Sequence, residues 1–136
     1  MLAIVDTGPL YAAADLDDEN HLRCLAVLQR ADLDLVVPAL VVAEASYLLG
    51  TRLGAHAEAI FLRTLESLEV EAPLAEEWSR IADLVERYGG FPLGAADASI
   101  IALAQRLGTE LIVTLDRRHF RAIPNHDGRP FTLLPD

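Results

Sequence analysis

The chain has 136 residues, of which 52% are hydrophobic, so it is long enough to bury one core and short for two domains. Its 21 acidic residues outnumber 11 basic ones, all of them arginines, and the net charge is -10. This balance excludes nucleic-acid binding through a broad basic face, so such a partner needs local arginines or a metal ion that bridges to phosphate.

Strands and helices are expected to alternate along the chain. Short apolar runs rich in β-branched residues predict strands at 2–6, 33–38, 67–71 and 111–114, with a weaker one at 131–134. Helical periodicity predicts helices at 17–31, 39–53, 54–65, 73–88 and 93–108, the last ended by Gly108. This alternation indicates one α/β domain over residues 1–136, with helices on both faces of a mostly parallel sheet.

Cysteine content and the N-terminal stretch bear on where the protein resides. The single cysteine, Cys24, cannot form an internal disulfide, and we expect it in the core. The stretch "MLAIVDTGPL" has no basic region before its apolar run, and no apolar stretch reaches membrane-spanning length. We therefore expect a cytoplasmic protein without a membrane partner. The stretch 125–130 reads as a turn, so His126 and Asp127 are interpreted as turn residues rather than ligands.

Two acids close predicted strands. Asp6 follows the first strand and Asp116 follows the run at 111–114. In an open parallel sheet the carboxyl ends of the strands line the ligand crevice, so both side chains are expected at the same mouth. Asp6 alone has a second interpretation as the N-cap of a following helix, which Pro9 supports.

Two further acids lie on predicted helices. Glu44 shares the four-residue spacing of Leu40 and Leu48, which places it on the apolar stripe of its helix. Asp97 lies three or four residues from apolar positions of its own helix and is likewise expected to face inward. The alternative for Asp97 is an acid at a helix N-terminus, stabilised by the helix dipole.

Four carboxylates in one partly dry crevice repel one another, and a divalent cation removes that difficulty. Hard oxygen ligands, with no histidine or cysteine in the set, select Mg²⁺ or Mn²⁺ over zinc. An ion of this kind makes a bound water nucleophilic and stabilises charge on phosphate. The pattern therefore predicts phosphodiester hydrolysis with Asp6, Glu44, Asp97 and Asp116 as catalytic metal ligands.

Arginines and threonines beside these acids suggest supporting roles. Arg117 and Arg118 begin the predicted loop after Asp116, where they can clamp a substrate phosphate, or form an ordinary solvated turn. Thr7 and Thr114 can orient the acids or a metal-bound water, or make ordinary turn hydrogen bonds.

Four stretches, "IVDTGPL", "VVAEASYLL", "PLGAADASIIALAQRLG" and "IVTLDRRHF", together resemble the PIN domain, and more narrowly the VapC-type ribonuclease toxins of bacterial toxin-antitoxin pairs. The likeness spans nearly the whole chain. It implies a three-layer α/β/α sandwich, Mg²⁺- or Mn²⁺-dependent endonucleolytic cleavage of RNA, and neutralisation by a VapB-type antitoxin. The family's metal-site acids fall on Asp6, Glu44, Asp97 and Asp116, and its small polar residue after the first acid falls on Thr7.

Other features of the family carry over with one departure. The "TxDxxxF" ending is met by Thr114, Asp116 and Phe120, whereas Gly8 stands where many relatives have alanine or a small polar residue. We expect Gly8 to change loop flexibility and not metal binding. Such antitoxins commonly push a basic side chain into the acidic site.

Assembly follows from the resemblance as well. Toxins of this kind usually form homodimers, and the stretches 11–22 and 61–68 offer apolar helical surfaces for a dimer, an antitoxin or the core. Trp78 is interpreted as a packing residue, with an interface anchor as the alternative.

Two other classes compete with the nuclease interpretation. Phosphoryl-transfer proteins of the receiver or haloacid-dehalogenase type also end their first strand in Asp, but they need a lysine, which this chain lacks, and a second acid where Gly8 stands. The second class is a non-catalytic PIN-like module whose acids bind a metal or a protein without cleaving RNA. Substitution of Asp6 or Asp97 by Asn in a growth assay separates the nuclease from the non-catalytic module, because only a nuclease should lose its toxicity.

Overall fold

Five short strands form one sheet in the computed structural model, which describes residues 1–91, 93–125 and 127–136. The strand order is β3-β2-β1-β4-β5, and each neighbouring pair is parallel. The strands are β1 (Leu2–Val5), β2 (Asp34–Pro38), β3 (Glu69–Glu71), β4 (Leu111–Val113) and β5 (Thr132–Leu134). The predicted parallel sheet is thereby confirmed.

The order of the strands reverses between β1 and β4. From β1 the chain moves outward to β2 and β3, then returns to place β4 on the other side of β1. Ile4 in β1 consequently pairs with Val36 in β2 and with Ile112 in β4. Such a reversal opens a crevice at the carboxyl ends of the two central strands, and this is where ligands bind in open α/β sheets.

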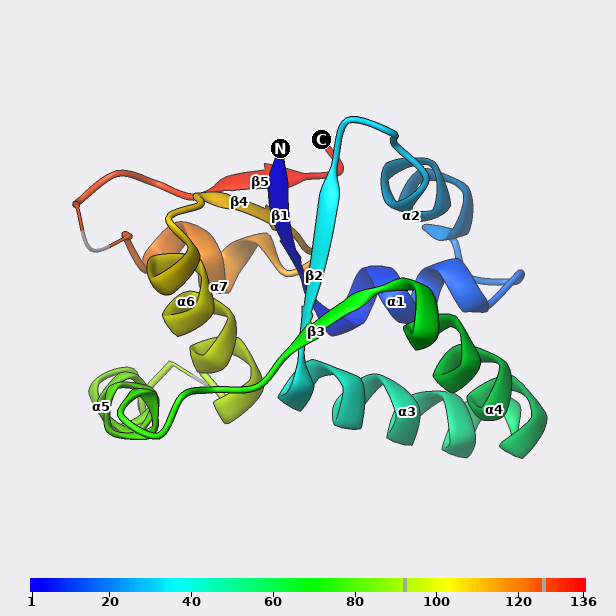
Figure 1. Ribbon diagram of the computed structural model, residues 1–136, viewed down its shortest axis with the longest axis horizontal. Coiled ribbons are helices and arrows are strands. Elements are labelled where there is room, and N and C mark those ends of the chain that lie inside the picture. The colour runs from blue at the N-terminus through cyan, green and yellow to red at the C-terminus, as the bar shows by residue number, and fades with distance from the viewer. Residues whose placement is uncertain (92, 126) are drawn as a thin grey trace.

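Helices cover both sides of the sheet, as predicted. Figure 1 shows α1 to α4 on one side of the strands and α5 to α7 on the other. Their bounds are α1 (Thr7–Ala14), α2 (His21–Leu28), α3 (Ala39–Leu53), α4 (Ala55–Thr64), α5 (Glu77–Arg87), α6 (Ala95–Leu107) and α7 (Arg117–Ala122), with a 3-10 turn at Leu65–Ser67. Gly108 ends α6 in the left-handed conformation, with φ of 69°.

The core lies between these layers. Ile4, Val36 and Ile112 are fully buried in the three central strands, which explains why those strands read as continuous apolar runs without alternation. Along α6 the residues 98–104 are all buried, because small and aliphatic side chains dominate that stretch. Cys24 is fully buried as expected, and burial raises the pKa of its thiol.

The two longest loops of the prediction, 7–16 and 115–130, contain helices. Helix α1 begins directly after Asp6, and its first turn tolerates Pro9 because the N–H groups there have no partner within the helix. Gly8 therefore lies in a helix, and the expectation that it alters a loop is wrong. Helix α7 replaces the loop predicted after Asp116, because a helix of 6 residues is too short to show a periodic pattern.

Smaller differences concern element ends and single residues. Helix α2 begins at His21, later than the predicted start at 17, because the preceding acidic residues form turns. The Trp78 side chain is 50% exposed, so its interpretation as a packing residue is wrong. Asp127 accepts a hydrogen bond from the backbone N of Arg129 at 3.0 Å, as expected in a turn, whereas His126 lies outside the described residues. No helix among residues 1–91, 93–125 and 127–136 combines the length and apolarity needed to cross a membrane.

Candidate active site

A cleft of about 560 Å³ opens at the carboxyl ends of β1 and β4. The four acids singled out from the sequence all line it, although they come from widely separated parts of the chain. The lining residues are Asp6, Thr7, Gly8, Glu44, Leu48, Asp97, Leu115, Asp116 and His119. Because the cleft coincides with the reversal of strand order, the sheet topology itself brings these acids together.

Asp6 is fixed where β1 passes into α1. Its carboxylate accepts hydrogen bonds from the Thr7 backbone N and from the Thr114 hydroxyl, both at 2.7 Å. The side chain caps α1, so the N-cap interpretation is confirmed, and the same residue lines the cleft. Burial raises the pKa of Asp6 and outweighs the two hydrogen bonds, and the charge of Asp116 adds to the increase.

Thr114 connects the ends of the two central strands. Its side chain is fully buried, and its hydroxyl donates to Asp6 Oδ2 at 2.7 Å while it accepts from the backbone N of Asp116 at 2.9 Å. The Thr114 hydroxyl therefore orients the Asp6 carboxylate and also fixes the start of the segment that contains Asp116.

Replacing Thr114 with valine is expected to lower the free energy of unfolding by about 2–3 kcal/mol, because the variant leaves a buried carboxylate and a backbone N–H without this partner. Thr114→Ser is the matched control, since it keeps the hydroxyl and loses one methyl group at a cost of about 1 kcal/mol. Urea denaturation of both variants measures the difference. A Val variant as stable as the Ser variant would contradict the bridging role.

Glu44 occupies a different face of α3 from the one predicted. The buried residues of α3 are Val41, Ala45 and Leu49, so the apolar stripe runs one position away from Glu44, and the side chain of Glu44 is exposed to the cleft. Partial burial nevertheless raises its pKa, and the charge of Asp6 adds to the increase.

Asp97 lies in the first turn of α6, as its alternative interpretation held, and its side chain also points into the cleft with 19% exposure. Its pKa is raised to about 7, mainly by burial and then by the charge of Asp6, with smaller increases from Asp116 and Glu44, while His119 opposes the increase. All four acids therefore share one electrostatic field.

His119 is the residue of this cleft that the sequence did not reveal. Its Nδ1 lies 3.1 Å from Asp97 Oδ2 and 2.7 Å from Asp116 Oδ2. The expectation that no histidine belongs to the acidic set is therefore wrong. The available signal was the three-residue spacing from Asp116, which is one helical turn, but it has meaning only once the segment is known to be α7.

The two arginines after Asp116 have different surroundings. The Arg117 guanidinium donates to the backbone oxygen of Pro135, which ties it to the C-terminal segment. Arg118 is exposed, and its guanidinium carbon lies 5.3 Å from the centre of the Phe91 ring. Arg118 is therefore the one of the two that is exposed, and it is adjacent in α7 to His119 of the cleft.

The donors in the cleft suit a divalent cation. Ligand atoms of Asp97, Asp116 and His119 lie within 4.8 Å of one another, whereas Asp6 and Glu44 face the same cleft outside this trio. The Thr7 hydroxyl also lines the cleft, and although Thr7 is only 5% exposed, its Oγ1 has no hydrogen-bond partner among the described residues. An unpaired buried oxygen beside several carboxylates fits a hydrated cation, whose coordinated waters can donate hydrogen bonds to these oxygens.

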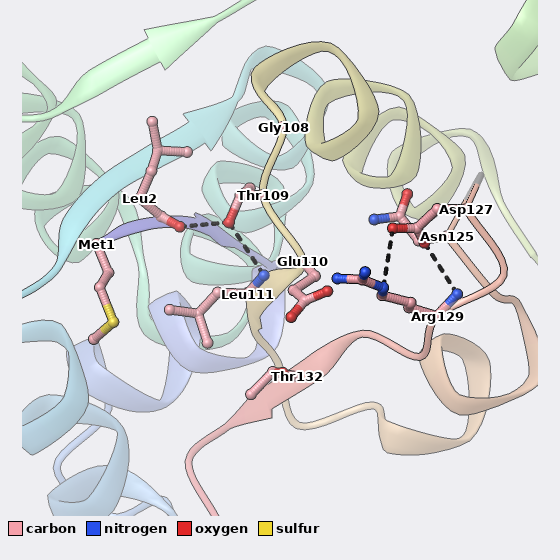
Figure 2. Close-up of a pocket in the computed structure, with 10 residues that line it drawn as sticks. All are labelled: Met1, Leu2, Gly108, Thr109, Glu110, Leu111, Asn125, Asp127, Arg129 and Thr132. Atoms are coloured by element: carbon pink, nitrogen blue, oxygen red, sulfur yellow. Dashed lines mark hydrogen bonds and ion pairs between the residues drawn. The ribbon is translucent and has the colours of Figure 1, made fainter.

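A second cleft, of about 510 Å³, lies at the opposite ends of the strands (Figure 2). Figure 2 shows Thr109 between Leu2 and Leu111, with its hydroxyl donating to the Leu2 oxygen at 2.7 Å. Arg129 and Asp127 form an exposed ion pair at 3.7 Å on its far side. The Thr109 hydrogen bond ties the turn before β4 to β1, and this second cleft lies at the amino ends of the strands, away from the acidic cleft.

Comparison with known proteins identifies the family. Residues 3–125 match the family model of the PIN domain. The chain belongs to the PIN-domain family. This PIN protein is also similar to the ribonuclease VapC26 of Mycobacterium tuberculosis, with 38% identity over 134 residues that cover 97% of this chain and 99% of the relative.

Solved structures show the same fold at lower sequence identity. Mycobacterium tuberculosis VapC20, a toxin that cleaves the sarcin-ricin loop, superimposes with a TM-score of 0.74 at 18% identity, covering 81% of the PIN protein and 86% of VapC20. VapBC2 of Rickettsia felis, bound to a DNA fragment from its promoter, gives 0.72 at 19% identity, covering 99% and 100% of the two chains. The predicted PIN-like three-layer architecture is thereby confirmed.

Proposed function

We propose that this PIN protein is a divalent-metal-dependent endoribonuclease and the toxin of a toxin-antitoxin pair. The observation that carries the proposal is the convergence of Asp6, Glu44, Asp97 and Asp116 on one cleft at the reversal of strand order. The ribonuclease relative, which is 38% identical over 97% of the chain, supports the reaction class.

Each residue of the cleft has a role in this proposal. Asp97 and Asp116 hold the ion, and Asp6 and Glu44 complete the negative field around it. A bound Mg²⁺ or Mn²⁺ lowers the pKa of a coordinated water and offsets the charge that builds up on the scissile phosphate. Thr114 keeps the Asp6 carboxylate in place, and the unpaired Thr7 hydroxyl faces the same space.

Charge determines how RNA reaches the cleft. A chain with net charge -10 repels a polyanion, so the cation in the acidic cleft supplies the attraction that the protein surface lacks. We assign Arg118 the contact with a substrate phosphate, because it is exposed and adjacent in α7 to His119 of the cleft, whereas Arg117 is held by the Pro135 oxygen.

A VapB-type antitoxin is the partner we propose. Two solved structures that resemble this fold are assemblies with a second component, namely VapBC2 of Rickettsia felis and FitAcB of Neisseria gonorrhoeae. FitAcB matches with a TM-score of 0.53 at 20% identity, covering 82% of this chain and 86% of that chain. A basic antitoxin side chain in the cleft would be attracted by four carboxylates and would block the ion.

A homodimer, a single nuclease domain over 1–136 and a cytoplasmic location remain our predictions. The stretches 11–22 and 61–68 named for a dimer do expose large apolar side chains, since Leu16 and Leu22 are 82% and 78% exposed and Leu62 of α4 is 44% exposed. A molar mass of twice the chain mass of 14.8 kDa in light scattering would support the dimer.

Cleavage of total RNA by the purified protein tests the proposed activity. We expect fragments in the presence of Mg²⁺ or Mn²⁺ and intact RNA after EDTA, because without the cation the acids repel the phosphate backbone. Restoring activity by excess Mn²⁺ after EDTA controls for irreversible damage. Cleavage that persists in EDTA contradicts the metal mechanism, and metal binding without any cleavage would favour the non-catalytic PIN-like module.

A further inference from the structure

We propose that His119 is a nitrogen ligand of the metal site and gives this site a preference for Mn²⁺ over Mg²⁺. The inference rests on the proposed metal-dependent function and extends it, because the acids alone form an oxygen site with no such preference.

The spacing of the donor atoms carries this inference. Neighbouring ligands of an octahedral ion with bonds of ~2.1 Å lie about 3 Å apart. His119 Nδ1 lies 3.1 Å from Asp97 Oδ2 and 2.7 Å from Asp116 Oδ2, which are separations of that size. One ion could therefore contact this nitrogen and both carboxylates, since the three donor atoms lie within 4.8 Å of one another.

The imidazole is held in this position by its surroundings. Its ring meets Phe91 edge-on with centroids 4.9 Å apart, and the side chain is 14% exposed. The next residue, Phe120, is fully buried and packs edge-on against Phe131 with centroids 6.3 Å apart, which anchors α7 to the core. A ring packed in this way keeps Nδ1 directed at the carboxylates.

The choice between metals follows from ligand chemistry. Mg²⁺ is a hard ion that prefers oxygen donors and retains its waters, whereas imidazole nitrogen binds first-row transition ions more readily. A single nitrogen among carboxylates therefore favours Mn²⁺ while it still permits Mg²⁺. The competing role is that His119 only pairs with the acids by charge, in which case its removal would strengthen the binding of both ions.

Electron spin echo spectroscopy of the Mn²⁺-loaded wild-type protein tests the ligand directly. Modulation from a ¹⁴N nucleus bound to Mn²⁺ is expected, and it should disappear in His119→Phe, which keeps an aromatic ring against Phe91 and removes the nitrogen. His56→Phe, at an exposed position on α4, is the matched control and should retain the modulation. A wild-type spectrum without nitrogen modulation would overturn the inference even if the variant failed to fold.

Calorimetric titration of the metal-free proteins with each ion separates this inference from the proposed function. In His119→Phe we expect the Mn²⁺ affinity to fall about tenfold and the Mg²⁺ affinity to change much less. An unchanged ratio of the two affinities, or tighter binding of both ions, would disprove the nitrogen ligand and leave the metal-dependent nuclease standing. A wild-type protein that binds neither ion would disprove both proposals.

Discussion

Asp6→Asn lowers the rate of RNA cleavage by at least about a hundredfold, since the metal charge it helps to hold stabilises the transition state by several kcal/mol. Asparagine has almost the same shape as aspartate and is an equally good N-cap, so α1 should still begin at Thr7. The Thr114 hydroxyl can still pair with the side-chain amide. The variant therefore removes a charge from the cleft with little effect on the fold.

A cleavage time course with a labelled RNA, together with toxicity during expression in growing cells, measures this effect. The matched control is Asp83→Asn, an identical chemical change at an exposed position on α5, which should leave both readouts at the wild-type level. If Asp6→Asn remains as active and as toxic as the wild type, the acidic cleft is not the catalytic site.

The metal-free protein should lose stability as the pH rises from about 4 to about 8. The pKa of Asp97 is about 7 in the folded chain and returns to its ordinary value of 3.8 on unfolding. Between these values the folded state binds the proton that the unfolded state has released, so the free energy of unfolding falls through this window and levels off above pH 7. The raised pKa of Asp6 acts in the same direction.

We expect the free energy of unfolding to fall by about 2 kcal/mol over this window. A pKa shift corresponds to ~1.4 kcal/mol per unit, and the expected fall is smaller than the full shift implies because Asp97 is partly exposed to solvent. The corresponding fall in Tm is about 5 °C or more. Added Mn²⁺ should raise Tm more at pH 8 than at pH 5, because the ion binds the deprotonated carboxylates.

Thermal unfolding in EDTA and in Mn²⁺ at the two pH values checks this prediction. Asp97→Asn serves as the reference, because it lacks the titrating group and should show a smaller loss between pH 5 and pH 8 and a weaker response to the ion. A wild-type pH dependence equal to that of Asp97→Asn would show that Asp97 does not titrate in this window.

The loss of cleavage in Asp6→Asn and the fall of stability with pH have the same physical origin, which is the repulsion between carboxylates placed close together. The cleft contains four carboxylates from β1, α3, α6 and the end of β4, and the pKa values of three of them, Asp6, Glu44 and Asp97, are raised. Repulsion between these carboxylates thus lowers the stability of the metal-free protein, and binding of a cation raises it again. Activity and stability should accordingly respond to the same ions.

The position of the acids could be predicted because it depends on local sequence and on sheet topology. Asp6 and Asp116 each follow an apolar run, and parallel strands bring their carboxyl ends to one edge of the sheet. Gly108 ended α6 as expected. The face of Glu44 was predicted less well, because a one-position error in the stripe of α3 changes the direction of its side chain by about 100°.

The sequence by itself determined the alternation of strands and helices, the parallel sheet and the acids at its carboxyl edge, since each follows from periodicity within a short stretch. Only the tertiary structure decided that His119 lies between Asp97 and Asp116, and that the Pro135 oxygen holds Arg117. These contacts depend on how α7 packs beside α6 and the C-terminal segment. The contacts of His119 with Asp97 and of Arg117 with Pro135 join residues far apart in the chain, and the short spacing of His119 from Asp116 has meaning only once α7 is known to be a helix.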